Sequence, residues 1–437
     1  MFTEDITAIV VDPGSLNLRA GYSGEDNPRI VSPSQVGIRE IIEQVENSEI
    51  QEEIKKKQYL AGDNALCSVK ENMDVEHTYF QGKIVNEDGF VALLQHVYDV
   101  TRSNASDYCL LMSESNMVID QGKQDQKQRE LMTELAFEKL GVPNFFLAKS
   151  AVLSAFSSGR QNALVLDTGG YSTFAVPVFD GYSLKKSIIK ANIGGEFLTE
   201  KLLNHVEQEK KQEIVPRYRL EFDNSQQPKK VSSILDLPNI RPSFDKYQKL
   251  LVARDIKETV CKVDDKNLSL QERELDRNNY PLPDGNFLHI DSASTEYSEF
   301  FFTRQRVNEQ DKNGDPYIPQ EFQEGDLLHF KGMQNMVVDS INSCDIDIRK
   351  ELFQNIVVTG GNSLLNGFCS RLTQKLTDVA PQNSRVKMIA YPSSTERKFS
   401  SWIGGSILAS LGSFQSMWVS KQEYQEQGVS IIDKKFP

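Results

Sequence analysis

The sequence predicts an α/β protein whose two lobes are built on the same plan. Two stretches have the pattern of an apolar strand that ends in an Asp-x-Gly turn and returns as a second strand; the turns lie at Asp12 and Asp167. A third unit, from Ile356, runs from an apolar strand through Gly360 and Gly361 into a helix. The recurrence of the strand–Asp-x-Gly–strand unit indicates a duplicated core rather than a short-period repeat.

The remaining elements follow from hydrophobic periodicity and from turn residues. Gly141 and Pro143 provide a stop signal for the helix that precedes them. The charge-free stretch 402–418 is short for a membrane span and contains three glycines, so we expect a buried helix there. The patterns predict strands at 6–12, 18–22, 107–112, 163–167 and 172–179, and helices at 88–101, 126–140, 150–157 and 247–260.

Three polar stretches interrupt these elements. Residues 39–58 are rich in Glu and Lys and are expected to form either a solvated helix or a mobile excursion. Residues 205–248 contain several prolines and are expected to be a partly disordered surface insertion, and 304–326 to be a similar loop.

Composition excludes several classes of function. The chain has 49 Lys and Arg against 62 Asp and Glu, a net charge of −13, which argues against phosphate-dominated binding to DNA or RNA. This charge is compatible with basic protein partners, although an acidic surface kept for solubility explains it as well.

Five dispersed cysteines without a C-x-x-C pair suggest neither a zinc site nor a disulfide framework. The acidic N-terminus does not resemble a secretory signal, so we expect a soluble intracellular protein.

The two Asp-x-Gly hairpins have a chemical interpretation. A tight turn with Gly lets backbone amides approach a phosphate closely, and hydroxyls such as Ser15 or Thr168 add donors. Asp12 and Asp167, at the strand ends, could hold waters around Mg²⁺. A single such turn is usually an ordinary hairpin. Two that face each other would clamp a nucleoside triphosphate, and the Gly-Gly turn at Gly360 could receive its adenosine or a phosphate.

Long motifs resemble a known family over nearly the whole chain. The segments 254–258, 344–350, 396–411 and 417–424 are very similar to actin, and the paired hairpins resemble the actin, Hsp70 and sugar kinase superfamily. Within the actin-related proteins, 111–114, 145–153 and 399–402 resemble the fourth nuclear subfamily, the actin-like subunit of chromatin remodellers. Only 39–80, 205–248 and 304–326 diverge from actin or are longer.

The resemblance implies an actin-like two-lobed α/β fold of four subdomains, with a duplicated ribonuclease-H-like core and a central nucleotide cleft. The expected division is 1–38, 81–158 and 390–437 for subdomain 1 of the outer lobe, 39–80 for subdomain 2, 159–195 and 327–389 for subdomain 3 of the inner lobe, and 196–326 for subdomain 4 with its insertions.

The resemblance also implies a set of ATP-binding residues, with Asp12 and Asp167 holding Mg²⁺ through water. The phosphate loops would comprise Gly14, Ser15, Leu16, Asn17 and Arg19, and Gly169, Gly170 and Tyr171. The ribose and adenine side would comprise Arg254, Lys257, Glu258, Gly360, Gly361, Asn362, Leu364, Leu365 and Lys398. Leu16 replaces a Gly of actin, which leaves it main-chain contact at best, and Arg19 keeps the positive charge of an actin Lys.

Three departures from actin concern hydrolysis. Actin positions its attacking water with a Gln and a His, and uses a further Asp in the metal shell. The matching positions here are Ser150, Phe174 and Gly170. Phosphoryl transfer depends on positioning the nucleophile and stabilising charge. We therefore expect ATP binding without efficient hydrolysis, and we assign no catalytic residue.

The resemblance favours a nuclear structural subunit of chromatin-remodelling and histone acetyltransferase complexes, with roles in transcription regulation and DNA repair. Its expected partners are monomeric actin, a scaffold helix of a remodelling ATPase or acetyltransferase subunit, and histones, with no membrane and no direct sequence-specific nucleic acid. The alternatives are a filament-forming cytoskeletal ATPase and a metabolic kinase. The kinase would need a catalytic Asp on a substrate hydroxyl, and no sugar-binding signature is evident. Trp402 and Trp418 are expected in the core rather than at an interface.

Overall fold

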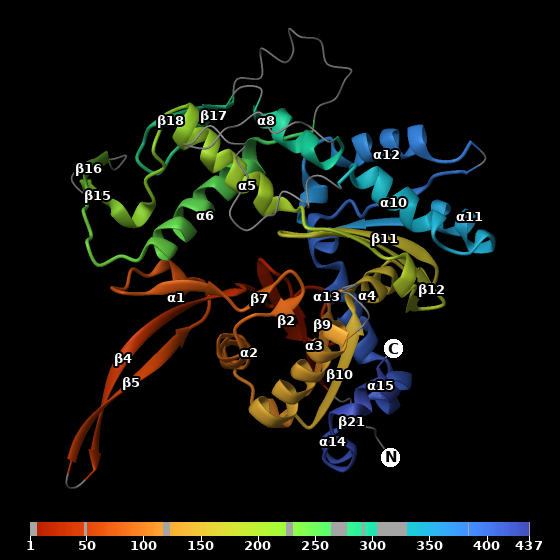
Figure 1. Cartoon of the computed structure of the whole chain (residues 1–437), viewed down its shortest axis with the longest axis horizontal. Coiled ribbons are helices and arrows are strands. Elements are labelled where there is room, and N and C mark those ends of the chain that lie inside the picture. The colour runs from red at the N-terminus through yellow and green to blue at the C-terminus, as the bar shows by residue number, and fades with distance from the viewer. Residues whose placement is uncertain are drawn as a thin grey trace.

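The chain folds into two lobes, an outer and an inner one, each around its own sheet. Figure 1 shows the outer lobe below the inner lobe, with the helices of the inner lobe above its sheet. The computed structural model describes residues 7–47, 50–116, 123–223, 230–263, 278–290, 293–303, 330–382 and 384–436.

The outer lobe is built on a six-stranded sheet with the order β21-β10-β9-β1-β2-β3. Its central strand β1 pairs antiparallel with β2 and parallel with β9, and β9 pairs parallel with β10. The strands are β1 (Ala8–Pro13), β2 (Asn17–Tyr22), β3 (Ile30–Pro33), β9 (Cys109–Glu114), β10 (Asn144–Lys149) and β21 (Val419–Ser420).

The inner lobe repeats this arrangement. Its central strand β11 pairs antiparallel with β12 and parallel with β19, and β19 pairs parallel with β20. The strands are β11 (Ala163–Thr168), β12 (Thr173–Phe179), β13 (Tyr182–Ser183), β14 (Ile189–Ala191), β19 (Ile356–Thr359) and β20 (Met388–Ile389). Both hairpins therefore hold the same place in their sheets, which confirms the predicted duplication.

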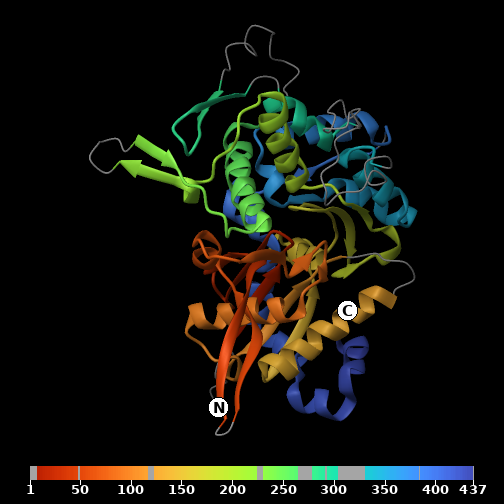
Figure 2. The ribbon, with the colours of Figure 1, turned by 60° about the vertical axis from the view of Figure 1, so that its left-hand side comes forward.

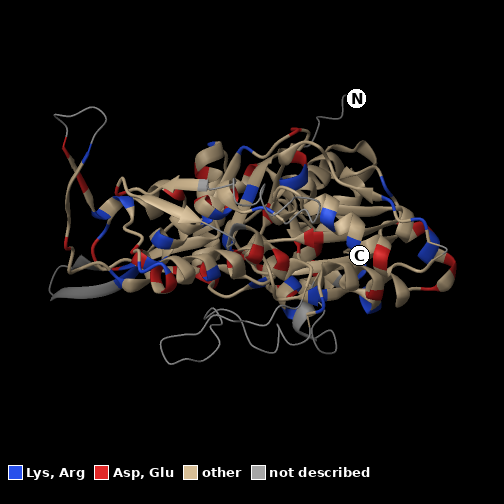
Figure 3. Cartoon of the chain, turned by 90° about the horizontal axis from the view of Figure 1, so that it is seen from above, with Lys and Arg blue, Asp and Glu red and all other residues tan. Residues whose placement is uncertain are grey.

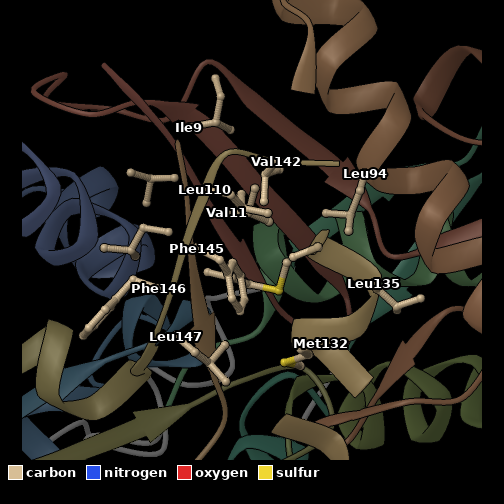
Figure 4. Close-up of a cluster of buried hydrophobic side chains, with 14 of the residues drawn as sticks. Ile9, Val11, Leu94, Leu110, Met132, Leu135, Val142, Phe145, Phe146 and Leu147 are labelled. Carbon is tan, nitrogen blue, oxygen red and sulfur yellow. The ribbon is translucent and has the colours of Figure 1, made fainter. Parts of the chain in front are cut away.

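The core of the outer lobe joins its sheet to the surrounding helices. Figure 4 shows apolar side chains of β1, β9 and β10 gathered with Leu94, Met132 and Leu135 from the neighbouring helices. Trp402 is fully buried and donates from its indole nitrogen to Val10 O at 3.0 Å, which confirms its expected place in the core. The helices are α2 (Glu87–Thr101), α3 (Lys123–Glu134), the π-helical η3 (Leu135–Leu140), α4 (Ser150–Ser157), α13 (Ser394–Ser410), α14 (Lys421–Gln427) and α15 (Ile432–Lys435).

Helix α13 begins and ends earlier in the chain than the buried helix expected over 402–418. It ends at Ser410, and the 3₁₀ segment η9 (Gly412–Met417) follows, so Trp418 reaches the core from outside the helix.

Gly404 permits the close crossing of α13 and α4, because a Cβ there would lie 2.0 Å from Leu153 O. None of the helices in the described residues is both long and apolar enough to cross a membrane.

The inner lobe encloses a second core. Phe197, Phe301, Met333 and Phe368 are fully or almost fully buried in it, together with Leu164 and Leu166 of β11. The surrounding helices are α5 (Gly195–Asn204), the π-helical η5 (His205–Glu209), α6 (Pro242–Val260), α8 (Ala293–Glu296), η7 (Tyr297–Phe301), α10 (Met333–Asn342), α11 (Ile346–Gln354), η8 (Gly361–Leu364) and α12 (Phe368–Val379).

A long hairpin replaces the helix considered for 39–58. Strands β4 (Gln35–Asn47) and β5 (Ile50–Leu60) pair antiparallel and extend away from the body (Figures 1 and 2), while α1 (Asp63–Cys67) and β6 (Asp74–His77) lie at their base. The register sets Glu40 opposite Lys57, so opposite charges face each other across the strands. The helical alternative was wrong, because the backbone from Gly37 to Asn47 pairs antiparallel with β5. Strands β7 (Tyr79–Phe80) and β8 (Lys83–Ile84) form a short hairpin of their own.

The 205–248 stretch is more ordered than expected. It contains η5, the hairpin of β15 (Leu220–Asp223) and β16 (Lys230–Ile234), and the first turns of α6. Its side chains Ile214 and Phe244 are buried, so the surface-insertion prediction was wrong for those residues. The β15–β16 hairpin projects from the inner lobe (Figure 2), and a further hairpin joins β17 (Asn278–Pro281) to β18 (Phe287–Ile290). The predicted loop at 304–326 lies outside the described residues.

The acidic net charge is not gathered on a single face in the view from above. Figure 3 shows acidic and basic residues interspersed along both lobes. This distribution fits the solubility interpretation at least as well as it fits a basic partner.

Candidate nucleotide-binding site

A pocket opens between the lobes where the tips of the two central hairpins meet. It is lined by the β1–β2 and β11–β12 turns, the start of α5, the end of α6, the loop after β19 and residues 398–401 of α13. All of the nucleotide-binding and metal residues proposed from the sequence line it except Arg254 and Leu364. Whether the lining residues contact a nucleotide stays a prediction.

The two hairpin turns share one backbone geometry. In the first, Gly14 N donates to Asn17 O at 3.0 Å, and in the second Gly169 N donates to Ser172 O at 3.0 Å. A Cβ on Gly14 would lie 2.7 Å from Asn17 O, which explains why this turn requires glycine. The matched turns direct equivalent backbone segments toward the same space.

Neighbouring elements fix the position of each turn. The Gln81 amide donates to Ser15 Oγ at 2.9 Å, and this contact leaves the Ser15 hydroxyl proton available to a ligand. At the second turn, the first amides of α5 donate to the loop carbonyls: Gly195 N to Gly169 O at 3.0 Å and Glu196 N to Gly170 O at 2.8 Å. Both turns are therefore preorganised.

Asp12 and Asp167 lie at equivalent strand ends and differ in their partners. Asp12 is buried, accepts from Ser113 and from Ser401 Oγ at 3.0 Å, and is 3.2 Å from the Arg19 guanidinium. Asp167 accepts no hydrogen bond from the described residues. Burial and the Asp12 carboxylate raise the pKa of Asp167 to about 6, against a smaller opposing effect of Arg19.

This carboxylate pair fits a hydrated magnesium ion. Mg²⁺ commonly binds to one or two carboxylates together with waters and substrate phosphates, and a cation would offset the repulsion between Asp12 and Asp167. Among the described residues, no group of three or more His, Cys, Asp or Glu side chains is arranged to hold a metal alone.

The three positions that depart from actin all line the pocket. Phe174 is paired in register with Asp167 and presents an aromatic ring where the first hairpin presents Arg19. Ser150 begins α4 and accepts from the Asn116 amide at 2.8 Å. Gly170 has no side chain. The described pocket lining supplies neither an imidazole nor a glutamine amide at these positions.

The Gly-Gly turn after β19 closes the opposite side of the pocket. Gly360 has a φ of +92°, and a Cβ there would lie 2.2 Å from Thr168 O, so only glycine permits this approach. Asn362 Nδ2 donates to Thr168 Oγ1 at 3.0 Å and to Gly169 O at 2.7 Å. Asn362 therefore links the predicted adenosine loop to the second phosphate loop.

A buried ion network lies beside the pocket. Arg254 makes a bidentate pair with Glu196 at 2.9 Å, and Lys257 Nζ donates to Gly195 O at 3.0 Å and Thr199 Oγ1 at 2.9 Å. Burial alone would raise the pKa of Glu196, but Arg254, Lys257 and Thr199 lower it to about 2. Arg254 thus supports the first turn of α5 rather than facing the pocket.

Two further side chains lie at the rim where the adenosine is predicted to bind. Lys398 Nζ of α13 lies 4.0 Å from Glu258 Oε2 of α6, so an ion pair spans the two lobes at the pocket rim. Leu364 faces away from this pocket and lines a separate surface depression with Cys369 and Arg397.

Sequence reasoning missed several lining residues. Glu196 and the serines at 113, 115, 154, 400 and 401 line the pocket. Ser400 and Ser401 immediately precede Trp402 within one of the segments that resemble actin, and that neighbourhood could have identified them. Nothing in the sequence marks Glu196, because its role depends on Arg254, which lies far from it along the chain.

Comparison with known proteins accounts for the whole chain. The model of the Actin family matches residues 3–437. The chain is 36% identical to actin-related protein 4 of Oryza sativa, in both the indica and japonica subspecies, over 454 aligned residues. It is 34% identical to actin-related protein 4 of Arabidopsis thaliana over 457 residues, and each alignment covers 99% of both chains.

Proposed function

Because this chain belongs to the actin family and is an actin-related protein of the actin-related protein 4 type, we propose that it is a nuclear, ATP-binding structural subunit that hydrolyses ATP poorly. The matched turns, the acidic pair and the glycine-rich adenosine loop support nucleotide binding. The observation that carries the proposal is the placement of Phe174, Ser150 and Gly170 along the phosphate side of the same pocket.

The binding role follows from the residues of the two turns. The amides near Gly14 and Gly169 and the Ser15 hydroxyl would donate to phosphate oxygens, and Arg19 would add positive charge at their edge. Asp12 and Asp167 would hold waters of a magnesium ion, which when bound neutralises phosphate charge. Lys398 and Glu258 would lie beside the base.

Poor hydrolysis follows from what the pocket lacks. An attacking water needs a polar group that orients it, and the transition state needs groups that stabilise developing charge. Phe174 has no polar atom in its side chain, and the side chain of Ser150 is shorter than the glutamine that actin uses. Bound ATP would therefore stabilise the fold by mass action, since a ligand that binds only the folded form shifts the folding equilibrium.

The assembly role rests on the full-length relationship to actin-related protein 4. We place the protein in chromatin-remodelling and histone acetyltransferase complexes, paired with monomeric actin on a scaffold helix, with histones as a further candidate partner. The net charge of −13 is compatible with basic partners of this kind.

Affinity purification of the full chain from nuclear extract, followed by mass spectrometry, tests this role. We expect recovery of actin together with a remodelling ATPase or acetyltransferase subunit. Recovery of cytoskeletal proteins alone would reject it. The filament-forming alternative is tested by pelleting with magnesium and ATP, where we expect the protein to remain in the supernatant.

A further inference from the structure

Leu16 and Gly170 meet across the pocket, one from each phosphate loop. A Cβ built on Gly170 would lie 3.0 Å from Leu16 Cβ, 3.5 Å from its Cδ2 and 3.7 Å from its Cγ. Such a Cβ–Cβ distance is shorter than in ordinary packing, where carbon atoms lie about 3.5–4.0 Å apart. A Cβ at position 170 would therefore require the Leu16 side chain to shift by a few tenths of an ångström, so glycine fits this contact best.

Neither backbone is free to relieve this contact. The Leu16 carbonyl accepts from Ser34 N at 3.0 Å, and the Gly170 carbonyl accepts from Glu196 N at 2.8 Å. Gly194 packs beneath the second loop, where a Cβ would lie 2.3 Å from Gly170 O. Each loop is thus held from behind by its own lobe, and the Leu16 side chain fills the space between them.

Leu16 belongs to the outer lobe by sequence and to the inner lobe by packing. It is partly buried against the core cluster of the inner lobe. A ring cluster makes a second connection of the same kind: the Tyr171 ring lies 4.7 Å from Phe80 and 5.2 Å from His77, both from the segment between β5 and α2. Tyr171 directly follows Gly170, so the two connections are adjacent.

We propose that Leu16 is a strut that joins the two phosphate loops and, with the Phe80–Tyr171 contact, holds the lobes together without nucleotide or cation. The missing carboxylate at position 170 is then a steric consequence of Leu16 rather than an independent loss. The effect on nucleotide exchange rests on the proposed nucleotide binding, whereas the strut itself does not.

A double-mutant cycle tests the strut on the full chain without nucleotide, in EDTA. The variants are Leu16→Gly, Gly170→Ala and the double substitution, compared by the midpoint of urea unfolding. We expect Gly170→Ala to lower the midpoint, or to prevent folding, in the presence of Leu16 and to cost little in the Leu16→Gly background. Equal losses in both backgrounds, including failure to fold in both, would overturn the proposal.

Release of a fluorescent ATP analogue tests the consequence for exchange. The variant Leu16→Ala keeps the Cβ and removes the rest of the Leu16 side chain. We expect it to release the analogue about tenfold faster, because one contact between the lobes is weakened. Leu235→Gly, in a partly exposed loop outside the pocket, is the control and should release it at the wild-type rate. If Leu16→Ala releases the analogue at the wild-type rate, Leu16 has no role in nucleotide exchange. If the wild-type protein does not bind the analogue at all, the proposed function is refuted, and the double-mutant cycle remains the test of the strut.

Discussion

Phe174 lies directly opposite Asp167 in the second phosphate hairpin, with their alpha carbons paired across β11 and β12. The equivalent pair in the first hairpin is Arg19 opposite Asp12, whose side chains are 3.2 Å apart. The duplicated core therefore carries one acidic residue with a cationic partner and one beside an aromatic ring. Because of this asymmetry, Asp167 has no ion pair among the described residues, and Arg19 offsets only part of the effect of burial and Asp12 on its pKa.

Asp167 is expected to destabilise the nucleotide-free protein. Because burial and the nearby Asp12 raise its pKa from 3.8 to about 6, the folded state binds this proton more tightly than the unfolded state does. Stability then falls as the pH rises from about 4 to about 6, by up to about 3 kcal/mol. Asp167→Asn should raise the free energy of unfolding at pH 7.5 and leave it nearly unchanged at pH 3.5, as measured by urea unfolding in EDTA.

The same substitution should weaken binding of magnesium and ATP. Asn keeps the size of the side chain and loses its charge. Nucleotide affinity is measured by titration with and without Mg²⁺, which separates the effect on magnesium-dependent binding from the effect on binding of the nucleotide alone. An Asp167→Asn variant that is neither more stable at pH 7.5 nor weaker in magnesium-dependent binding would contradict the assignment of this carboxyl.

Restoring polar groups at the two hydrolysis positions should increase turnover. The double substitution Ser150→Gln and Phe174→His supplies the groups that actin uses to position water, and positioned acid–base side chains contribute roughly 10²–10⁴-fold in other enzymes. We expect at least about a tenfold faster single-turnover hydrolysis, since the surrounding pocket is not optimised. Phe174→Leu, which stays apolar, is the control; equal rates for both variants would show that these positions do not limit hydrolysis.

The buried Glu196–Arg254 pair is expected to support stability at neutral pH. Glu196 and Arg254 are 1% and 16% exposed at their side chains, so removing one partner leaves a buried charge, at a cost of about 3–5 kcal/mol. Because the pKa of Glu196 is lowered to about 2, this stability is fully present above about pH 4.5 and is lost as the pH falls toward about 2.

Glu196→Gln should therefore lower the free energy of unfolding at pH 7 and flatten its decline below pH 4.5. Glu213→Gln is a matched control, because Glu213 is 59% exposed and pairs with Arg219 at the surface, where such pairs contribute about 1 kcal/mol or less. Urea unfolding between pH 3 and pH 7 compares the two. Equal losses for both variants would contradict the structural role of the buried pair.

The elements near the site could be predicted from the sequence because local signals define them. Apolar strands that end in Asp and Gly predict the hairpins at Asp12 and Asp167, and both have the expected backbone. The 39–58 segment could not be assigned in this way. Its mixed acidic and basic residues suit a solvated helix or a two-stranded sheet, and the antiparallel register that sets Glu40 opposite Lys57 exists only in the folded chain.

The candidate site was predictable only where one loop carries its own signal. The glycines of the three turns are visible in the sequence. The contact of Leu16 with Gly170 and the pairing of Glu196 with Arg254 join residues far apart in the chain, and neither follows from any local pattern. Arg254 was placed beside the nucleotide by resemblance, while its side chain is held by Glu196 outside the pocket lining.

The crossing of α13 over α4 should be intolerant of any side chain at Gly404. A Cβ there would lie 2.0 Å from Leu153 O, and backbone cannot move aside without separating the helices. Gly404→Ala should cost about 3 kcal/mol or more, at or beyond the upper range for overpacked cores. Gly412→Ala is the matched control, because no atom lies within 4 Å of its added Cβ. Similar unfolding midpoints for the two variants would contradict this packing.

Single-turnover hydrolysis by purified monomer tests most directly whether the pocket binds ATP without turning it over. The protein is loaded with radiolabelled ATP and magnesium, freed of excess nucleotide and quenched at intervals, with polymerised actin measured in parallel. We predict that the bound nucleotide is recovered as ATP throughout the interval in which polymerised actin converts its own to ADP. A rate like that of polymerised actin would contradict the role assigned to Phe174, Ser150 and Gly170.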